Sequence, residues 1–192
     1  MKPKSELERR LGGRATEPLE LVDASGVSVG AATLLECHRA PGKLHRAFSV
    51  YLFDGAGRLL VHQRAAAKAL WGGHWTNSCC SHPRPGEDPI QAAARRSAEE
   101  LGTAPGALAQ CFEYVYRAAF SEPGCDDIGV EHEFVHVLTG TAEPDTLRPA
   151  PEEVDGVRWL SPSEVTSLLA GPEPTTPWFA LAWPKLLEHK SR

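Results

Sequence analysis

The sequence predicts an α+β domain in which helices flank a mixed β-sheet. Two observations lead to this class: apolar runs typical of strands outnumber helical patterns, and strands and helices do not strictly alternate. The chain has 192 residues, of which 42% are hydrophobic and 23% charged. This length allows one well-buried core and is short for two domains. We therefore expect a flexible N-terminal extension over residues 1–17 and a single domain over residues 18–192.

Strand patterns begin and dominate the predicted domain. Residues 19–30 predict a strand, an Asp-Ala-Ser-Gly turn and a second short strand. Two apolar runs around an Asp-Gly-Ala-Gly turn predict a hairpin over residues 47–65. Later strands are expected over residues 111–119, 130–140 and 154–160.

Helical patterns are fewer, and their ends are well marked. In the clearest one, residues 88–102, Asp88 can cap the free N–H groups and Gly102 can end the helix in a left-handed conformation. A capping-box pattern opens a second helix over residues 161–171, and a Thr-Pro pair opens a terminal helix over residues 176–189.

Charge and composition exclude several classes of partner. The net charge of −5 gives no broad cationic surface, so we expect neither nucleic acid nor a membrane as a partner. No run has membrane-spanning length, and the opening residues lack the apolar core of a secretory signal. We expect a cytoplasmic monomer that binds a small molecule. Its odd number of cysteines indicates reduced thiols rather than a disulfide framework: Cys37, Cys79, Cys80, Cys111 and Cys125.

The segment TNSCCSHPRPGE, residues 76–87, carries adjacent cysteines just before a histidine. Taken alone, Cys79 and Cys80 could be metal ligands, a disulfide, a nucleophile, or two small residues packed in a core. Strand alternation places them on opposite faces, with Cys79 directed into packing.

A second polar segment, EHEFVHV over residues 131–137, reads as a strand. Alternation places Glu131 and Glu133 on one face and His132 on the other. Two carboxylates on an inner face need a cation or a shared proton, whereas on a solvated edge strand they need neither. The residues alone leave both alternatives open, although the apolar residues that follow favour the strand entering a core.

Residues 81–102 resemble the Nudix box, the loop–helix–loop signature G-x5-E-x7-R-E-U-x-E-E-x-G. Ser81 replaces its first glycine, and Arg96 replaces the glutamate that helps Nudix hydrolases hold their metals. An arginine at that position argues against ordinary Nudix hydrolysis. The motif has a simpler alternative as well, because Arg95 and Glu99 could be an ordinary ion pair on a helix surface. The matching positions are Glu87, Arg95, Glu99, Glu100 and Gly102.

Further segments resemble type I isopentenyl-diphosphate isomerase, a Nudix-fold enzyme family, in order from residue 19 to residue 188. The resemblance implies the Nudix fold and isomerisation between isopentenyl diphosphate and dimethylallyl diphosphate. The alternatives are a Nudix-type diphosphate hydrolase and a silent binding module of the same fold. The matching segments are LHRAFSV, WGGHW, TNSCCSHP, the E-x-E strand and TPWFALAW.

The resemblance also implies a divalent metal site, for which imidazoles and carboxylates are suitable ligands. Mn²⁺, Mg²⁺ or Zn²⁺ would be held by three histidines and two glutamates. A second Mg²⁺ would bridge Glu100 and the substrate diphosphate. Cys80 is expected near the metal rather than on it. The implied ligands of the first metal are His38, His45, His82, Glu131 and Glu133.

Four residues are implied as catalytic. Glu133, next to Tyr116, would donate a proton, and Cys80 as a thiolate would accept one from the opposite face, with reversed roles in the back reaction. The π face of Trp183 would stabilise the developing carbocation.

The diphosphate would be bound by Arg64, Lys68 and Arg95. Leu34 stands where many relatives have a lysine that reaches the phosphates, so Lys43 or Arg46 would have to supply that contact. Residues 117–130 are longer than in compact relatives and are expected to form a lid of different shape.

Overall fold

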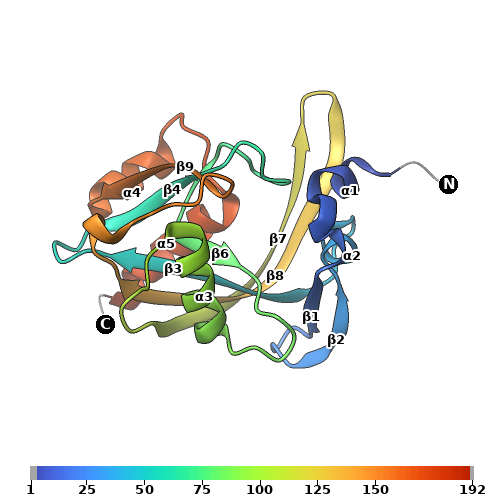
Figure 1. The fold of residues 1–192 in the computed structure, drawn as a ribbon, viewed down its shortest axis with the longest axis horizontal. Helices are drawn as coiled ribbons and strands as arrows, with labels where there is room; N and C mark the ends of the chain where they lie inside the picture. Colours follow the sequence, from blue (N-terminus) through green and yellow to red (C-terminus); the bar gives the residue numbers. More distant parts are fainter. Residues whose placement is uncertain (1–3, 191–192) are drawn as a thin grey trace.

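The computed structural model describes residues 4–190, except for the side chains of residues 126 and 127 (Figure 1). Its elements in chain order are α1 (Glu6–Leu11), the 3-10 helix η1 (Gly12–Thr16), β1 (Pro18–Val22), β2 (Ser28–Thr33), α2 (Leu34–His38), β3 (His45–Phe53), β4 (Leu59–Arg64), β5 (Trp75–Thr76), β6 (Cys79–Ser81), α3 (Pro89–Leu101), β7 (Ala109–Glu122), β8 (Cys125–Thr141), the 3-10 helix η2 (Pro144–Thr146), β9 (Val154–Leu160), α4 (Pro162–Ala170) and α5 (Pro177–Lys190). The mixed sheet and flanking helices confirm the predicted α+β class.

Strand β3 organises the sheet. It runs parallel to β8 and antiparallel to β1, β4 and β6. Phe48 is paired with both Ser81 of β6 and His136 of β8, so these two strands lie on opposite sides of β3. The same register sets Cys80 beside Ser49 on one side, and Glu133 beside His45 on the other.

The alternating side chains of β3 separate two cores. Ala47 and Tyr51 belong to the larger cluster, which α4 and α5 complete. The residues that alternate with them along β3 face a second cluster. This cluster lies beneath α3 and includes Ala92, Ala93 and Leu101. Cys79 lies fully buried in the second cluster and Cys80 packs against the first, which confirms that the two thiols face apart. Figure 1 shows α3 in front of the sheet, while α5 lies behind it.

The predicted helix ends are confirmed at α3. The Asp88 carboxylate accepts hydrogen bonds from the backbone N–H groups of Ile90 and Gln91 at 2.9 and 3.1 Å. Gly102 ends the helix with φ +66°, and a Cβ there would collide with the backbone carbonyl of Arg148. Only glycine satisfies both conditions without strain.

The prediction of a flexible extension over residues 1–17 is corrected by the structure. Residues 6–16 form α1 and η1, and Leu7 is buried in the larger core. Arg10 makes an ion pair with Glu122 near the tip of the β7–β8 hairpin. Two buried apolar residues, Leu7 and Ala15, and one long-range ion pair leave no periodic signal in the sequence, so the order comes from tertiary contacts. Residues 1–3 lie outside the described residues.

Two expectations about compartment and chemistry can be compared with the structure. All five cysteines are free thiols, as predicted. Within residues 4–190, no helix is both long and apolar enough to cross a membrane.

Candidate metal centre and substrate cavity

Five side chains from four segments converge at one end of the sheet. Each offers a ligand atom, and these atoms all lie within 4.8 Å of one another. The register of β3 and β8 brings two of them together, because His45 is paired with Glu133. The others come from the end of α2, the residue after β6 and the same face of β8. The five are His38, His45, His82, Glu131 and Glu133, which is the ligand set that the sequence resemblance implied.

The imidazole rings are oriented by backbone carbonyls. His38 Nδ1 donates to Leu34 O at 2.9 Å, and His45 Nδ1 donates to Lys43 O at 2.8 Å. Both rings therefore direct Nε2 toward the centre, as metal-binding histidines do. His45 Nε2 and His82 Nε2 lie 3.2 Å apart, and burial lowers the pKa of both groups to about 3. Neutral, converging imidazoles are suited to a cation.

The two carboxylates complete the donor set in different ways. Glu131 Oε2 is buried and lies 2.9 Å from His38 Nε2, yet it accepts no hydrogen bond. Glu133 Oε2 accepts from the Tyr116 hydroxyl at 2.9 Å, and Glu133 Oε1 lies 3.0 Å from His82 Nε2. Burial and the neighbouring Glu131 raise the pKa of Glu133 to about 7. A buried acceptor without a donor, among three imidazoles, fits a divalent cation. The group could therefore hold such a metal.

Cys80 lines a cavity that this centre also lines. Its Sγ donates to Asn77 Oδ1 at 3.0 Å and lies 3.4 Å from Ser49 Oγ. Burial raises the pKa of the thiol to about 11. Burial thus favours the protonated thiol. The role of Cys80 as a thiolate acceptor stays a prediction.

A buried chain of hydrogen bonds connects the Cys80 thiol to an indole. Trp178 Nε1 donates to Thr76 Oγ1 at 3.0 Å, and Thr76 Oγ1 donates to Asn77 Oδ1 at 3.1 Å. Asn77 Oδ1 is also the acceptor for Cys80. The Trp178 ring lies 6.3 Å from the Tyr116 ring and forms part of the cavity wall. The thiol and the indole are thus positioned by one network.

Comparisons with known proteins agree with this geometry. Residues 43–179 match the NUDIX domain. An isopentenyl-diphosphate Delta-isomerase of Nocardia farcinica is 52% identical over 164 residues, which cover 85% of this chain and 90% of that protein. The chain belongs to the isopentenyl-diphosphate Delta-isomerase family. A second such protein, of Streptomyces coelicolor, is 49% identical over 77% of this chain and 73% of its own length.

Solved structures support the fold independently of sequence. DR0079 of Deinococcus radiodurans is 20% identical, with a TM-score of 0.69 over 88% of this chain and 98% of that chain. A MutT protein of Methanosarcina mazei is 15% identical, with a TM-score of 0.59 over 78% of this chain and 96% of that chain. At these identities the likeness concerns the fold alone. It confirms the Nudix fold that the box motif predicted.

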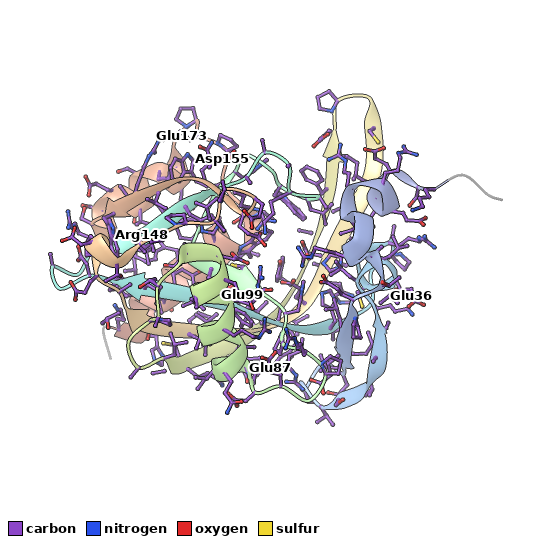
Figure 2. All side chains as sticks on the ribbon, in the orientation of Figure 1. Glu36, Glu87, Glu99, Arg148, Asp155 and Glu173 are labelled. Carbon is purple, nitrogen blue, oxygen red and sulfur yellow. The ribbon has the colours of Figure 1, made fainter. Side chains whose placement is uncertain are left out.

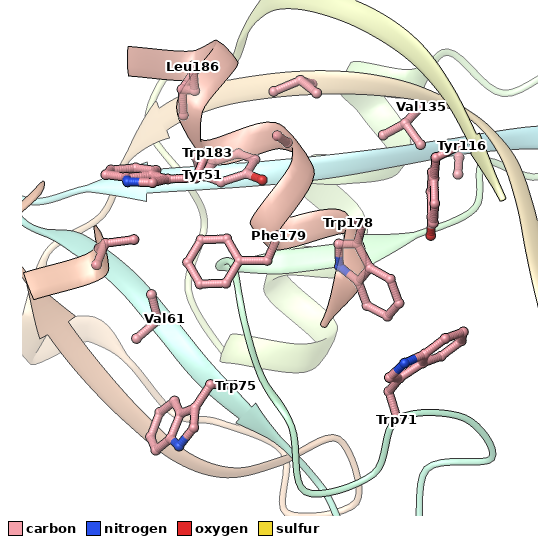
Figure 3. Packing of buried hydrophobic residues seen from close by; sticks show 14 of the residues in the cluster. Tyr51, Val61, Trp71, Trp75, Tyr116, Val135, Trp178, Phe179, Trp183 and Leu186 are labelled. Atoms are coloured by element: carbon pink, nitrogen blue, oxygen red, sulfur yellow. The ribbon is translucent and has the colours of Figure 1, made fainter. Parts of the chain in front are cut away.

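In this isopentenyl-diphosphate isomerase family member, α5 carries a second tryptophan, Trp183, which does not line the cavity. Trp183 is buried, and its Nε1 donates to Thr166 Oγ1 at 3.2 Å. Figure 3 shows it beside Tyr51, whereas Trp178 lies beside Tyr116 and Trp71. The two tryptophans are five residues apart on one helix and so point about 140° apart. Of these two tryptophans, Trp178 is the one that lines the cavity, and the role expected for Trp183 stays a prediction.

The same cavity has a cationic wall, which consists of Arg64, Lys68 and Arg96. Lys68 forms an ion pair with Glu153, and Arg96 forms ion pairs with Glu100, Glu153 and the more exposed Glu99. Glu100 is only 2% exposed. The ion pairs with these carboxylates hold Lys68 and Arg96 in place. Arg64 is tied differently. Its guanidinium donates to the carbonyls of Leu70 and Trp71 at 3.0 and 3.2 Å and lies over the Trp178 ring.

The structure places Arg96, not Arg95, in this wall. Arg95 makes two hydrogen bonds of 2.8 Å to Glu87 and a longer one of 3.3 Å to Glu99. Figure 2 labels Glu87 and Glu99, the two partners of Arg95. The sequence signal was available, because Arg96 lies four residues before the buried Glu100 and shares its helix face. Arg95 lines the adjoining hollow rather than this cavity, and its expected contact with the diphosphate stays a prediction.

The suggested substitutes for the missing lysine also lie elsewhere. Leu34 lines the cavity, as its position in the motif implied. Lys43, however, pairs with Glu36 at 3.4 Å, and Arg46 pairs with Glu20 at 2.5 Å. Neither of these cations lines the cavity. Residues 117–130 belong to the β7–β8 hairpin rather than to an irregular lid.

Proposed function

We propose that the protein interconverts isopentenyl diphosphate and dimethylallyl diphosphate in isoprenoid precursor biosynthesis. The observation that supports this most strongly is the presence of Cys80 and Glu133 in one cavity, from strands on opposite sides of β3. The relatives named isopentenyl-diphosphate Delta-isomerase, at about half identity over most of the chain, support the same reaction.

The reaction sets the requirements for the site. The terminal methylene of isopentenyl diphosphate gains a proton and becomes a methyl group, and the methylene bonded to the branched alkene carbon loses a proton as the double bond moves. An unactivated alkene is a poor base, so the transition state resembles a tertiary carbocation. The site must therefore provide a proton donor, a proton acceptor and a group that stabilises positive charge.

The lining residues can supply each of these. Cys80 and Glu133 form the donor–acceptor pair and exchange roles between the forward and reverse reactions. Tyr116 donates a hydrogen bond to Glu133 and thereby orients its carboxylate. The face of Trp178, rather than Trp183, stabilises the developing cation, since aromatic faces attract cations more strongly in a desolvated site.

The finer metal assignment is also part of the proposal. His38, His45, His82, Glu131 and Glu133 would hold Mn²⁺, Mg²⁺ or Zn²⁺, and Glu100 would hold a second Mg²⁺ together with the diphosphate. Bound there, the first metal would fix the Glu133 carboxylate and favour its charged form.

The diphosphate would be bound by the cationic wall. Arg64, Lys68 and Arg96 line the cavity, and guanidinium groups match phosphate oxygens in a two-pronged geometry. Arg96 replaces a glutamate of the Nudix box, so the same helix position that serves metal binding in hydrolases would serve substrate binding here. We also propose that the protein acts as a cytoplasmic monomer. Its thiols are free, and its proposed substrate is a small molecule.

Deuterium incorporation tests this proposal. The protein is incubated with Mg²⁺ and isopentenyl diphosphate in deuterated water, and the products are followed by NMR. Dimethylallyl diphosphate that carries deuterium in a methyl group is expected, without release of inorganic phosphate. Phosphate or pyrophosphate release without the isomer would instead establish the alternative, a Nudix-type diphosphate hydrolase.

A further inference from the structure

The N-terminal segment, residues 6–16, is fastened beside the substrate cavity. Arg10 donates to both carboxylate oxygens of Glu122 at 2.9 and 2.6 Å and reaches the carbonyl of Ala69 at 3.4 Å. Leu7 is buried in the larger core. One arginine thus connects α1, the β7–β8 hairpin and the loop after β4, and Figure 1 shows α1 beside that hairpin.

The fastened segment contributes side chains to the cavity itself. Leu11 and Arg14 line it together with His82 and Arg96. Arg14, His82 and Arg96 also line the hollow next to it, which extends along α3 at Arg95 and Glu99. Arg14 therefore lies where the two spaces meet.

Arg14 is the cation of this cavity with the weakest engagement. Within the part of the chain that the structure describes, it pairs with Glu17 alone, through Nε at 3.2 Å, and both side chains are about half exposed. Lys68 and Arg96 are instead bound to Glu153, a carboxylate only 16% exposed. Exposed ion pairs contribute little to stability, so Arg14 can exchange Glu17 for a phosphate at little cost.

The cavity also has a lining position, Leu34, that supplies no positive charge. Leu34 is apolar, and the nearby Lys43 and Arg46 are held by Glu36 and Glu20 outside the cavity. The protein carries a net charge of −5, so an anionic substrate depends on local cations.

We propose that Arg14 is a further binding residue for the substrate diphosphate, and that residues 6–16 deliver it when Arg10 is docked on Glu122. This inference rests on the proposed function, because it assigns a contact to the same diphosphate. Arg14 binds the diphosphate end of the substrate, and the reacting carbons lie on the metal-centre side of the cavity.

The test compares Arg14→Ala with Arg9→Ala. Arg9 is a matched control, because it lies on the same segment, pairs with Glu6 and has a side chain that is 58% exposed. Binding of inorganic pyrophosphate with Mg²⁺ is measured by calorimetry, and KM and kcat are measured with isopentenyl diphosphate. We expect Arg14→Ala to weaken binding and to raise KM about tenfold, equivalent to about 1.4 kcal/mol, with little change in kcat. Arg14→Lys should recover part of the loss, since it restores charge but not the planar fork.

A second variant examines delivery of the residue. Glu122→Ala removes the anchor and should raise KM several-fold, together with faster amide hydrogen exchange in residues 6–16. Thermal unfolding of each variant separates these effects from loss of fold. Equal pyrophosphate affinity in Arg14→Ala and Arg9→Ala would overturn the inference. Failure of the wild type to form dimethylallyl diphosphate would overturn the proposed function instead, because the pyrophosphate titration does not depend on turnover.

Discussion

The two sides of the cavity are built by different physical means. On the metal-centre side, buried imidazoles are oriented by backbone carbonyls, and strand register sets His45 beside Glu133. On the cationic side, Arg96 and Lys68 are positioned by carboxylates, and both pair with Glu153. Groups fixed by backbone geometry tolerate little displacement, whereas charges held by other charges can exchange partners. The difference suggests that the metal-centre side reacts and the cationic side binds.

The largest effect should come from the reacting thiol. Cys80→Ala removes one member of the proton-transfer pair and should lower kcat by about 10³-fold or more, since general acid–base groups contribute about 10²–10⁴-fold. Cys79→Ala is the control, because Cys79 lies in the other core and should affect thermal stability with kcat largely retained. Steady-state kinetics and thermal unfolding measure both. Equal losses of kcat in the two variants would contradict the assignment of one catalytic thiol.

Metal retention is expected to respond next. Glu131→Gln keeps the shape of the side chain but replaces one oxygen of the buried carboxylate with an amide nitrogen. We expect about 100-fold weaker metal binding, because even residues that only support ligands contribute about 10–100-fold. Metal content after dialysis against a chelator measures this. His132→Gln is the neighbouring control, since His132 contacts Gly42 O on the opposite face. Full metal occupancy in Glu131→Gln would exclude the five-residue centre.

A smaller effect should separate neighbouring arginines on α3. Arg96→Ala removes a cation from the cavity and should raise KM for isopentenyl diphosphate by about 10–100-fold, since hydrogen bonds to charged groups contribute about 1.5–3 kcal/mol. Arg95→Ala should leave KM nearly unchanged and should lower only the stability of the turn before α3. If Arg95→Ala had the larger effect on KM, the placement of the diphosphate on this wall would be wrong.

The smallest effect is expected for the two tryptophans. Trp178→Phe keeps an aromatic face but loses the stronger indole interaction, for which about 0.5–2 kcal/mol is typical, so kcat should fall about 3–30-fold. Trp183→Phe should mainly lower the melting temperature, because it removes a buried hydrogen bond to Thr166. A greater fall in kcat for Trp183→Phe would return the cation-stabilising role to that residue.

Much of the metal-centre side was predictable from sequence. Alternation placed Glu131 and Glu133 on one face, and motif resemblance supplied the three histidines that the structure gathers around them. The chemistry of ligands restricts residue type at each position, so spacing alone is informative. Cys79 and Cys80 were separated correctly for the same reason, because side chains on a strand alternate.

The cationic side and the N-terminal segment were harder to predict. Arg95 and Arg96 are adjacent, and only the position of the buried helix face decides which of them enters the cavity. Trp178 and Trp183 raise the same question on α5. The order of residues 6–16 depends on the contact between Arg10 and Glu122, which are 112 positions apart in sequence. No local pattern reports such a contact.

Titration with inorganic pyrophosphate and Mg²⁺ tests the division between the two sides most directly. The measurement compares Cys80→Ala with Arg96→Ala by calorimetry, without any need for turnover. We predict that Cys80→Ala binds pyrophosphate as the wild type does, while Arg96→Ala binds at least about tenfold more weakly, which corresponds to about 1.4 kcal/mol. Loss of affinity in Cys80→Ala together with wild-type affinity in Arg96→Ala would contradict it.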